Sequence, residues 1–251
     1  LPARGPGRRA VRYEMKAHLQ LGPHPLGRVP LVVGVISSGL TLDRLASGFR
    51  PSCDVVEFRA DLFGVDAPDW LPRAIELEQG GLPVLLTIRD SREGGRWFRS
   101  ERERMAVYTQ VLPFISAVDV ELNSPSCAAL ARAARERGRV SIGSFHDFAG
   151  MPDRDALRTI VQKGRALGVD IVKIAALAST ADELARLEAL LPERGDQLLC
   201  VLGMGPFGPE SRLRLARAGS CLTYGYADES NAPGQLSCAE LMQALRTDRS
   251  A

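Results

Sequence analysis

Lysine is scarce in this sequence: the 251 residues contain three lysines, Lys16, Lys163 and Lys173, against 29 arginines. Arginine therefore supplies nearly all the cations. Lys173 nevertheless lies inside the apolar run GVDIVKIAALAS of residues 168–179, which predicts a buried strand. Charge alone does not explain a lysine there. Unlike arginine, a lysine can lose its proton when it is desolvated and attack a carbonyl group.

Other absences narrow the class of protein. No apolar run is long enough to span a bilayer. The net charge is +2, and the arginines are scattered among nearly as many acids, so no basic stripe suits nucleic acid. The five cysteines form no C-x-x-C pair. They predict reduced core thiols in a cytoplasmic protein, and neither a zinc site nor a disulfide framework.

From residue 30 onward, short apolar runs alternate with longer amphipathic ones. The predicted strands cover residues 31–37, 55–61, 83–89, 117–122, 139–146, 170–177, 197–205 and 220–227. The predicted helices cover residues 41–47, 68–80, 100–113, 125–137, 153–167, 180–192, 209–218 and 237–246. Eight strands, each followed by a helix, indicate an α/β fold with parallel pairing, best satisfied by a (β/α)8 TIM barrel. An open doubly wound sheet is the alternative.

The first 29 residues differ from the rest, since they are rich in Pro, Gly and Arg and show no periodicity. We expect residues 1–29 to form a partly disordered N-terminal extension and residues 30–251 to form a single catalytic barrel domain. The extension contains His18 and His24, to which we assign no function.

Polar residues alternate with apolar ones on five successive predicted strands, and side chains of one parity share a face. The inward-facing residues would be Glu57, Arg59, Asp61, Thr87, Arg89, Asp119, Glu121, Ser144, His146 and Lys173. Each has an ordinary structural explanation: Lys173 would be a counterion of Glu57 or Glu121, and His146 a hydrogen-bonded core residue. Their convergence at one end of one barrel instead favours an active site, because burying so many charges is costly.

The segment GMGPFG, residues 203–208, matches the dinucleotide fingerprint G-x-G-x-x-G after a strand, and Asp228 lies twenty residues further on. Pro206 and Pro209 remove amide donors from the turn that would hold a pyrophosphate. We therefore interpret the segment as a tight turn that presents Arg212. Phosphate binding near strands seven and eight of a barrel stays open as the alternative.

Six motifs in order give a specific pattern: EFRAD, TIRDSREGG, SFHDF, IVKIA, MGPFGPESR and APGQ. Between about Val32 and Leu245 the chain resembles the type I 3-dehydroquinate dehydratases of the shikimate pathway. The resemblance implies a hydro-lyase that eliminates water from 3-dehydroquinate to give 3-dehydroshikimate through a lysine Schiff base. It also implies a homodimer.

The same resemblance implies roles for individual residues. Lys173 matches the Schiff-base lysine, His146 the general acid/base, and Glu93 the carboxylate that orients this histidine. The substrate-binding residues implied by the motifs are Glu57, Arg59, Arg89, Arg212, Asn231 and Gln235. Arg212 would hold the substrate carboxylate. Asn231 stands where the family commonly has serine, and Gln235 lies in the loop expected to close over the substrate.

The chemistry is consistent with these residue types. An iminium formed by a lysine is the electron sink that makes the proton next to a ketone acidic enough to remove, and burial favours the neutral amine that must attack. One imidazole can then take that proton and return one to the departing hydroxyl. We expect no metal or organic cofactor. A class I aldolase with the same lysine chemistry and a non-catalytic metabolite-sensing barrel remain as alternatives.

Overall fold

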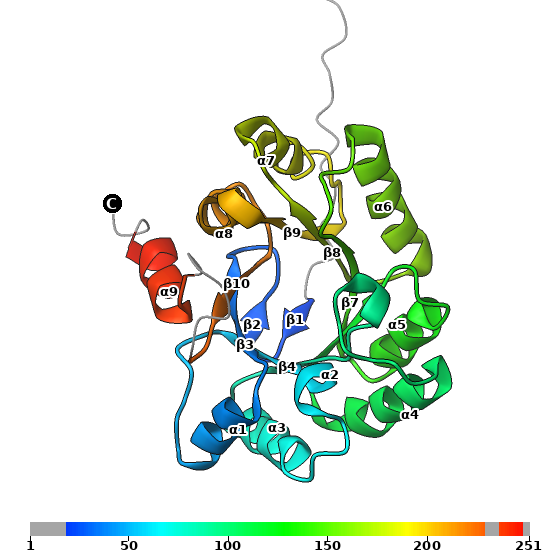
Figure 1. The fold of residues 1–251 in the computed structure, drawn as a ribbon, viewed down its shortest axis with the longest axis vertical. Helices are drawn as coiled ribbons and strands as arrows, with labels where there is room; N and C mark the ends of the chain where they lie inside the picture. Colours follow the sequence, from blue (N-terminus) through cyan, green and yellow to red (C-terminus); the bar gives the residue numbers. More distant parts are fainter. Residues whose placement is uncertain (1–18, 229–235, 248–251) are drawn as a thin grey trace, which may run out of the picture.

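The computed structural model describes residues 19–228 and 236–247, within which an eight-stranded parallel sheet curves around the centre of the molecule (Figure 1). Its strands are β3 (Leu31–Ile36), β4 (Val55–Arg59), β5 (Val84–Thr87), β6 (Ala117–Glu121), β7 (Val140–Asp147), β8 (Ile171–Leu177), β9 (Leu198–Met204) and β10 (Leu222–Tyr226). All eight lie where the sequence predicts them. The residues predicted to end the second strand, Ala60 and Asp61, instead begin a short helix, α2 (Ala60–Phe63).

Helices follow the strands and surround the sheet (Figure 1). They are α1 (Gly39–Ala46), α3 (Trp70–Gln79), α4 (Glu101–Val111), α5 (Cys127–Glu136), α6 (Arg154–Leu167), α7 (Ala181–Glu188), α8 (Gly208–Arg217) and α9 (Cys238–Thr247). Their starts are specified locally. Ser100 and Thr180 form capping boxes with Glu103 and Glu183, which satisfy backbone donors that the first helical turn leaves unpaired.

The strand order is β10-β3-β4-β5-β6-β7-β8-β9, so the last strand along the chain, β10, pairs with the first strand of the sheet, β3. The two ends of this order also meet, because the Cys221 amide directly before β10 donates to the Leu199 carbonyl of β9 at 2.8 Å. The sheet is therefore nearly closed into a barrel, which confirms the predicted (β/α)8 fold and excludes the open sheet. Apolar side chains from the outer strand faces pack under the helices, with Val56, Phe58 and Ile174 among them.

A two-stranded hairpin, β1 (Gln20–Leu21) and β2 (His24–Pro25), lies across the barrel interior in Figure 1. Leu21 and Leu26 of this segment pack with Leu31 and Val55, at the beginnings of their strands. The hairpin thus covers the N-terminal end of the barrel with apolar side chains. No sequence pattern predicts the hairpin, because four paired residues are too few to produce a periodic pattern.

Candidate active site

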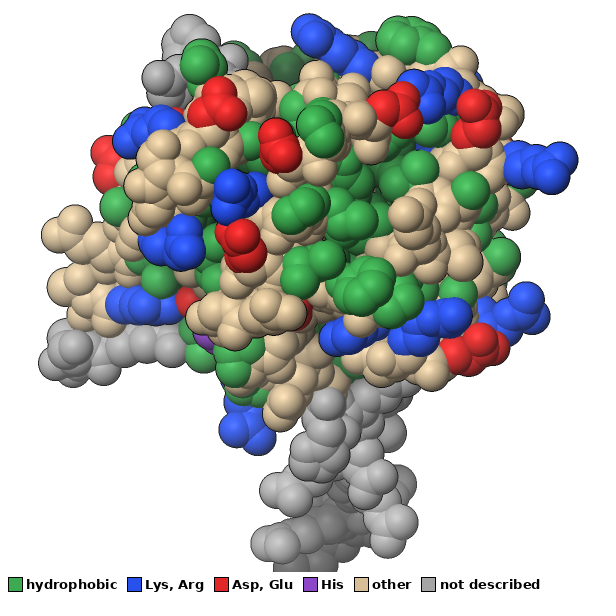
Figure 2. Space-filling model, turned by 90° about the horizontal axis from the view of Figure 1, so that it is seen from below, with side chains coloured by type: hydrophobic (Ala, Val, Ile, Leu, Met, Phe, Trp, Pro, Cys, Tyr) green, Lys and Arg blue, Asp and Glu red, His purple; other side chains and the backbone are tan. Residues whose placement is uncertain are grey.

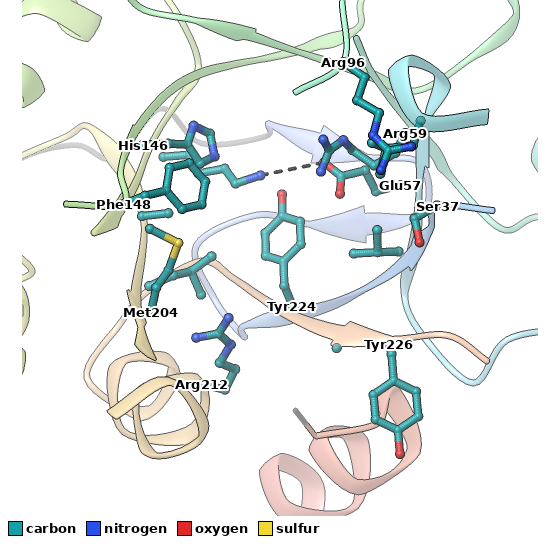
Figure 3. A pocket seen from close by; sticks show the side chains of 16 residues that line it. Ser37, Glu57, Arg59, Arg96, His146, Phe148, Met204, Arg212, Tyr224 and Tyr226 are labelled. Atoms are coloured by element: carbon teal, nitrogen blue, oxygen red, sulfur yellow. Dashed lines mark ion pairs between the residues drawn. The ribbon is translucent and has the colours of Figure 1, made fainter. Parts of the chain in front are cut away.

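A cavity of about 480 Å³ opens at the C-terminal ends of the barrel strands (Figure 3). Its lining brings together five of the predicted site residues: Glu57, Arg59, His146, Lys173 and Arg212. These side chains come from three strands, β4, β7 and β8, and from one helix, α8, so the barrel itself collects them. In TIM barrels this end of the strands carries the active site.

Lys173 lies in the middle of β8, and 5% of its surface is exposed. Its Nζ lies 3.1 Å from Asp119 Oδ2 and 3.7 Å from Glu57 Oε1. The same nitrogen lies 4.1 Å from the centre of the Tyr224 ring. If Lys173 were only a structural cation, its expected counterion would be Glu57 or Glu121. Glu57 does lie beside Lys173, and the second carboxylate is that of Asp119 rather than Glu121. The amine is thus held between two carboxylates and an aromatic face.

Four buried charges that do not line the cavity form ion pairs with one another, and we call them the inner charge layer: Arg89, Arg104, Asp119 and Glu121. Arg89 donates to Asp119 and to Glu121, each at 2.9 Å. Arg104 reaches in from α4 and donates to Glu121 at 2.6 Å. Burial opposes ionisation of Asp119, but Arg89 and Lys173 hold the pKa of its carboxyl well below the usual range.

Arg89, a predicted substrate-binding residue, is not part of the cavity lining. Its side chain is 3% exposed and does not line the cavity, because Asp119, Glu121 and the Ser144 hydroxyl surround its guanidinium. Its contact with Asp119 links it to Lys173 indirectly. Strand alternation placed Arg89 inside the barrel correctly but could not tell at which depth its head group ends.

His146 and Glu93 form a close pair. His146 Nδ1 lies 3.1 Å from Glu93 Oε2, and the same oxygen accepts the His146 backbone N–H at 3.0 Å. Burial, reinforced by the charges of Arg89 and Lys173, lowers the pKa of His146 well below its ordinary value, so the imidazole is neutral. Burial also raises the pKa of Glu93 to about 7. Because Nδ1 is hydrogen-bonded to the Glu93 carboxylate, the proton of the neutral imidazole lies on Nδ1, and Nε2 is free to act as a base.

Two glycines after Glu93 explain the REGG motif. Ser91–Glu93 form a single 3-10 turn, and Gly94 ends it with φ +78°. A Cβ on Gly94 would lie 2.6 Å from the Phe148 ring, and one on Gly95 would collide with the Arg89 carbonyl. Only glycines let this turn fold back against β5 and β7, which places Glu93 behind His146.

Arg212 extends from α8 into the cavity (Figure 3). Its Nη1 donates to the Gly203 carbonyl, to the Gly208 carbonyl at 3.0 Å and to the Ser211 hydroxyl at 3.1 Å. None of the residues described by the structure gives it a carboxylate partner, and burial lowers its pKa. The GMGPFG segment runs from β9 through a 3-10 turn into α8, the geometry expected of a tight turn that presents Arg212.

Arg59 lines the opposite side of the cavity. It makes two hydrogen bonds of 2.9 Å with Asp61, which fix its guanidinium plane. Asn231 and Gln235, the remaining predicted substrate-binding residues, lie outside the described residues.

Several lining residues were missed at the sequence level: Ser37, Arg96, Phe148, Met204 and Tyr224. Phe148 stacks on His146, with ring centres 6.2 Å apart. Tyr224 could have been found by applying to β10 the alternation used for the other strands. Arg96 and Phe148 lie in loops, where no periodicity reveals the direction of a side chain.

The described parts of the chain contain no group of three or more His, Cys, Asp or Glu side chains placed to hold a metal ion. Among the same residues, no helix has the length and apolar character needed to cross a membrane.

A TIM barrel with a buried lysine, a neutral histidine and an arginine without a carboxylate partner in one cavity is typical of enzymes that bind an anionic carbonyl compound through a lysine. A family model described as Type I 3-dehydroquinase matches residues 35–251. A 3-dehydroquinate dehydratase of Methanothrix thermoacetophila is 36% identical over 214 residues, covering 84% of this chain and 90% of that protein. A catabolic 3-dehydroquinate dehydratase of Acinetobacter baylyi is 32% identical over 205 residues, covering 77% and 75%.

The crystal structure of the 3-dehydroquinate dehydratase from Aquifex aeolicus superimposes with a TM-score of 0.77 and 27% identity, over 86% of this chain and 98% of that one. The chain belongs to the type I 3-dehydroquinase family. Membership confirms the resemblance and the predicted function, a hydro-lyase of the shikimate pathway that dehydrates 3-dehydroquinate through a Schiff base.

Proposed function

We propose that Lys173, His146 and Glu93 carry out the dehydration of 3-dehydroquinate in this chain, with Lys173 as the residue that forms the imine. The observation that carries the proposal is that Lys173, His146 and Arg212 line one cavity. Arg212 supplies a cation that none of the described carboxylates neutralises, which suits a substrate carrying a carboxylate.

The reaction then follows from these positions. The Lys173 amine adds to the ketone and loses water to give an iminium, which acidifies the neighbouring carbon. His146 Nε2 takes the proton from that carbon, and the electron pair moves toward the iminium. As the pair returns, the β-hydroxyl leaves with a proton from His146, and hydrolysis of the conjugated imine frees 3-dehydroshikimate and the lysine.

The remaining predicted residues divide into two groups. Glu57 and Arg59 reach the cavity and are proposed to hold ring hydroxyls. To Arg89 we assign the positioning of Asp119, the partner of Lys173, because its guanidinium donates to Asp119, Glu121 and the Ser144 hydroxyl. Asn231 and Gln235 are proposed to contact the substrate from the loop after β10.

The experiment compares His146→Ala with the wild type and with His24→Ala. His24 lies in the hairpin at the other end of the barrel, so its loss should leave turnover unchanged. A positioned general acid/base contributes roughly 10²–10⁴ in rate, so His146→Ala should lose turnover by about that factor while still forming the imine. Appearance of the conjugated enone gives the rate. Unchanged turnover in His146→Ala would remove this residue from the mechanism.

The same assay separates the alternatives. An aldolase would cleave a carbon–carbon bond and release an aldehyde or ketone fragment, whereas the dehydratase releases only water. A metabolite sensor would bind 3-dehydroquinate and return it unchanged.

We further propose a cytoplasmic homodimer. Support for a reducing compartment comes from Cys53, Cys127, Cys200, Cys221 and Cys238, which are all free thiols. Hydrophobic side chains gather on the side of the barrel that carries α1 and α3 (Figure 2), as is common where subunits meet. Light scattering at micromolar concentration should give twice the mass of one chain, and the mass of a single chain would contradict this part of the proposal.

A further inference from the structure

Tyr224 has a hydroxyl group with no hydrogen-bond partner among the described residues. Its side chain lies on β10 and is about nine-tenths buried, with 9% exposed. The oxygen is fully buried, yet none of the described residues forms a hydrogen bond with it. Buried hydroxyls almost always have a partner, and an unmade hydrogen bond costs free energy. A phenylalanine would fill the same space without this cost.

The hydroxyl belongs to a residue of the catalytic cavity. Tyr224 lines it, and Lys173 Nζ is 4.1 Å from the centre of its ring. Figure 3 shows the tyrosine pointing toward the ion pair between Lys173 and Glu57, which the dashed line marks. The ring face stabilises a cation on Nζ, and the hydroxyl points toward the ion pair of the lysine that must react with the ketone.

We propose that the Tyr224 hydroxyl donates a hydrogen bond to the substrate ketone oxygen while Lys173 adds to the ketone carbon. In this step the Nζ–C bond forms and the π electrons of the C=O bond move onto the oxygen. Tyr224 stabilises the negative charge that develops there and keeps its own proton. The inference rests on the proposed function, because it requires an imine at Lys173.

The surroundings of Tyr224 suit a donor rather than an acid. Burial, followed by the negative charges of Glu57 and Asp119 among other neighbours, raises the pKa of Tyr224 well above its ordinary value, and Arg89 opposes this only in part. The phenol therefore stays protonated throughout the cycle. A preorganised donor aimed at a developing oxyanion is the arrangement that oxyanion holes use.

The test is Tyr224→Phe, which keeps the ring beside Lys173 and removes only the oxygen. Rapid mixing with saturating substrate, followed by a borohydride quench and intact mass measurement, gives the rate of imine formation. We expect this rate to fall by about 10²-fold, the lower end of the loss seen when one oxyanion donor is removed. The melting temperature should be unchanged or higher, because no hydrogen bond of the free enzyme is broken.

Two ketones locate the contact. 3-Dehydroquinate and 3-dehydroshikimate share the ketone, but only the former carries the hydroxyl that is eliminated. A donor to the ketone oxygen slows imine formation with both compounds at saturation. Slowing with 3-dehydroquinate alone would overturn the proposal and place the contact at the eliminated hydroxyl.

The remaining outcomes separate this inference from the proposed function. Wild-type rates in Tyr224→Phe with both ketones would overturn the inference and leave the lysine mechanism intact. A lowered melting temperature with unchanged imine rates would also overturn it and show that the hydroxyl is structural. If the wild type itself forms no imine, the proposed function fails instead. Tyr224→Leu, which also removes the ring face, should additionally lower the fraction of protein trapped as imine at equilibrium.

Discussion

Two polar regions inside the barrel differ in how completely their groups are paired. In the inner charge layer, each of Arg89, Arg104, Asp119 and Glu121 forms a short ion pair with another member of the layer. In the cavity, the partners of Arg212 among the described residues are two backbone carbonyls and one hydroxyl, and the Tyr224 hydroxyl has no partner among the same residues. Tyr224 is buried like the members of the layer, so burial alone does not distinguish the two regions. What distinguishes them is that the charges of the layer are neutralised by one another, whereas the charge of Arg212 is available to a substrate.

Breaking the inner charge layer should cause the largest loss of stability. Arg89→Met leaves Asp119 and Glu121 each without one buried cation. Removing one partner of a buried ion pair typically costs roughly 3–5 kcal/mol, and we expect the free energy of unfolding, measured with urea, to fall by about that amount. Arg158→Met is the control, since Arg158 pairs with Glu193 on the surface and should change stability little. A loss no larger than that of the control would show that the layer is not a structural unit.

Removing Arg212 should act mainly on substrate binding. Arg212→Ala removes a charge-assisted contact to the substrate, worth roughly 1.5–3 kcal/mol, and should raise KM by about 10- to 150-fold. Arg214→Ala on the same helix removes a charge paired outside the cavity, with Glu188 and Glu210, and should leave KM unchanged. If KM of Arg212→Ala stays near that of the control, the substrate carboxylate binds elsewhere, and Arg59 is then the next candidate.

Glu93 lies between the two regions and should show a smaller, pH-dependent effect. Its pKa is about 7 in the fold against an ordinary 4.5. A raised pKa gives a stability contribution that is fully present below about pH 4.5 and is lost as the pH rises through about 7. Glu93→Gln escapes this loss, so between pH 5 and 8 its stability should rise relative to the wild type by roughly 1–3 kcal/mol.

Thermal unfolding across this pH range measures the difference for Glu93→Gln. Turnover of the variant should fall, because an amide no longer offers His146 a carboxylate. A stability difference that is flat with pH would show that the Glu93 carboxyl is already charged throughout.

The comparison also explains what could be predicted from the sequence. Period-two alternation located Lys173, His146 and Glu57, because a strand fixes which side of the sheet a side chain faces. The REGG and MGPFGPESR motifs located Glu93 and Arg212, whose positions depend on glycine turns that the sequence makes visible.

Depth and pairing could not be predicted in the same way. Asp119 lies on β6 and its partner Lys173 on β8, so their contact across the barrel depends on the register of three strands. Arg89 faces inward as expected, but its length lets the guanidinium reach Asp119 and Glu121 rather than the cavity. The sequence does not show whether the Tyr224 hydroxyl is paired, and only the folded barrel shows that none of the described residues bonds to it.

Borohydride trapping at Lys173 tests the central claim most directly. With 3-dehydroquinate and borohydride, the wild type should gain the mass of one reduced adduct and lose activity irreversibly. Peptide mapping should place the label on Lys173 and on neither Lys16 nor Lys163. Lys163→Arg should trap normally, whereas Lys173→Arg keeps a cation beside Asp119 but should trap nothing and be nearly inactive. A label on another residue, or substantial dehydratase activity in Lys173→Arg, would contradict the account and leave Lys173 as a counterion of Asp119 and Glu57.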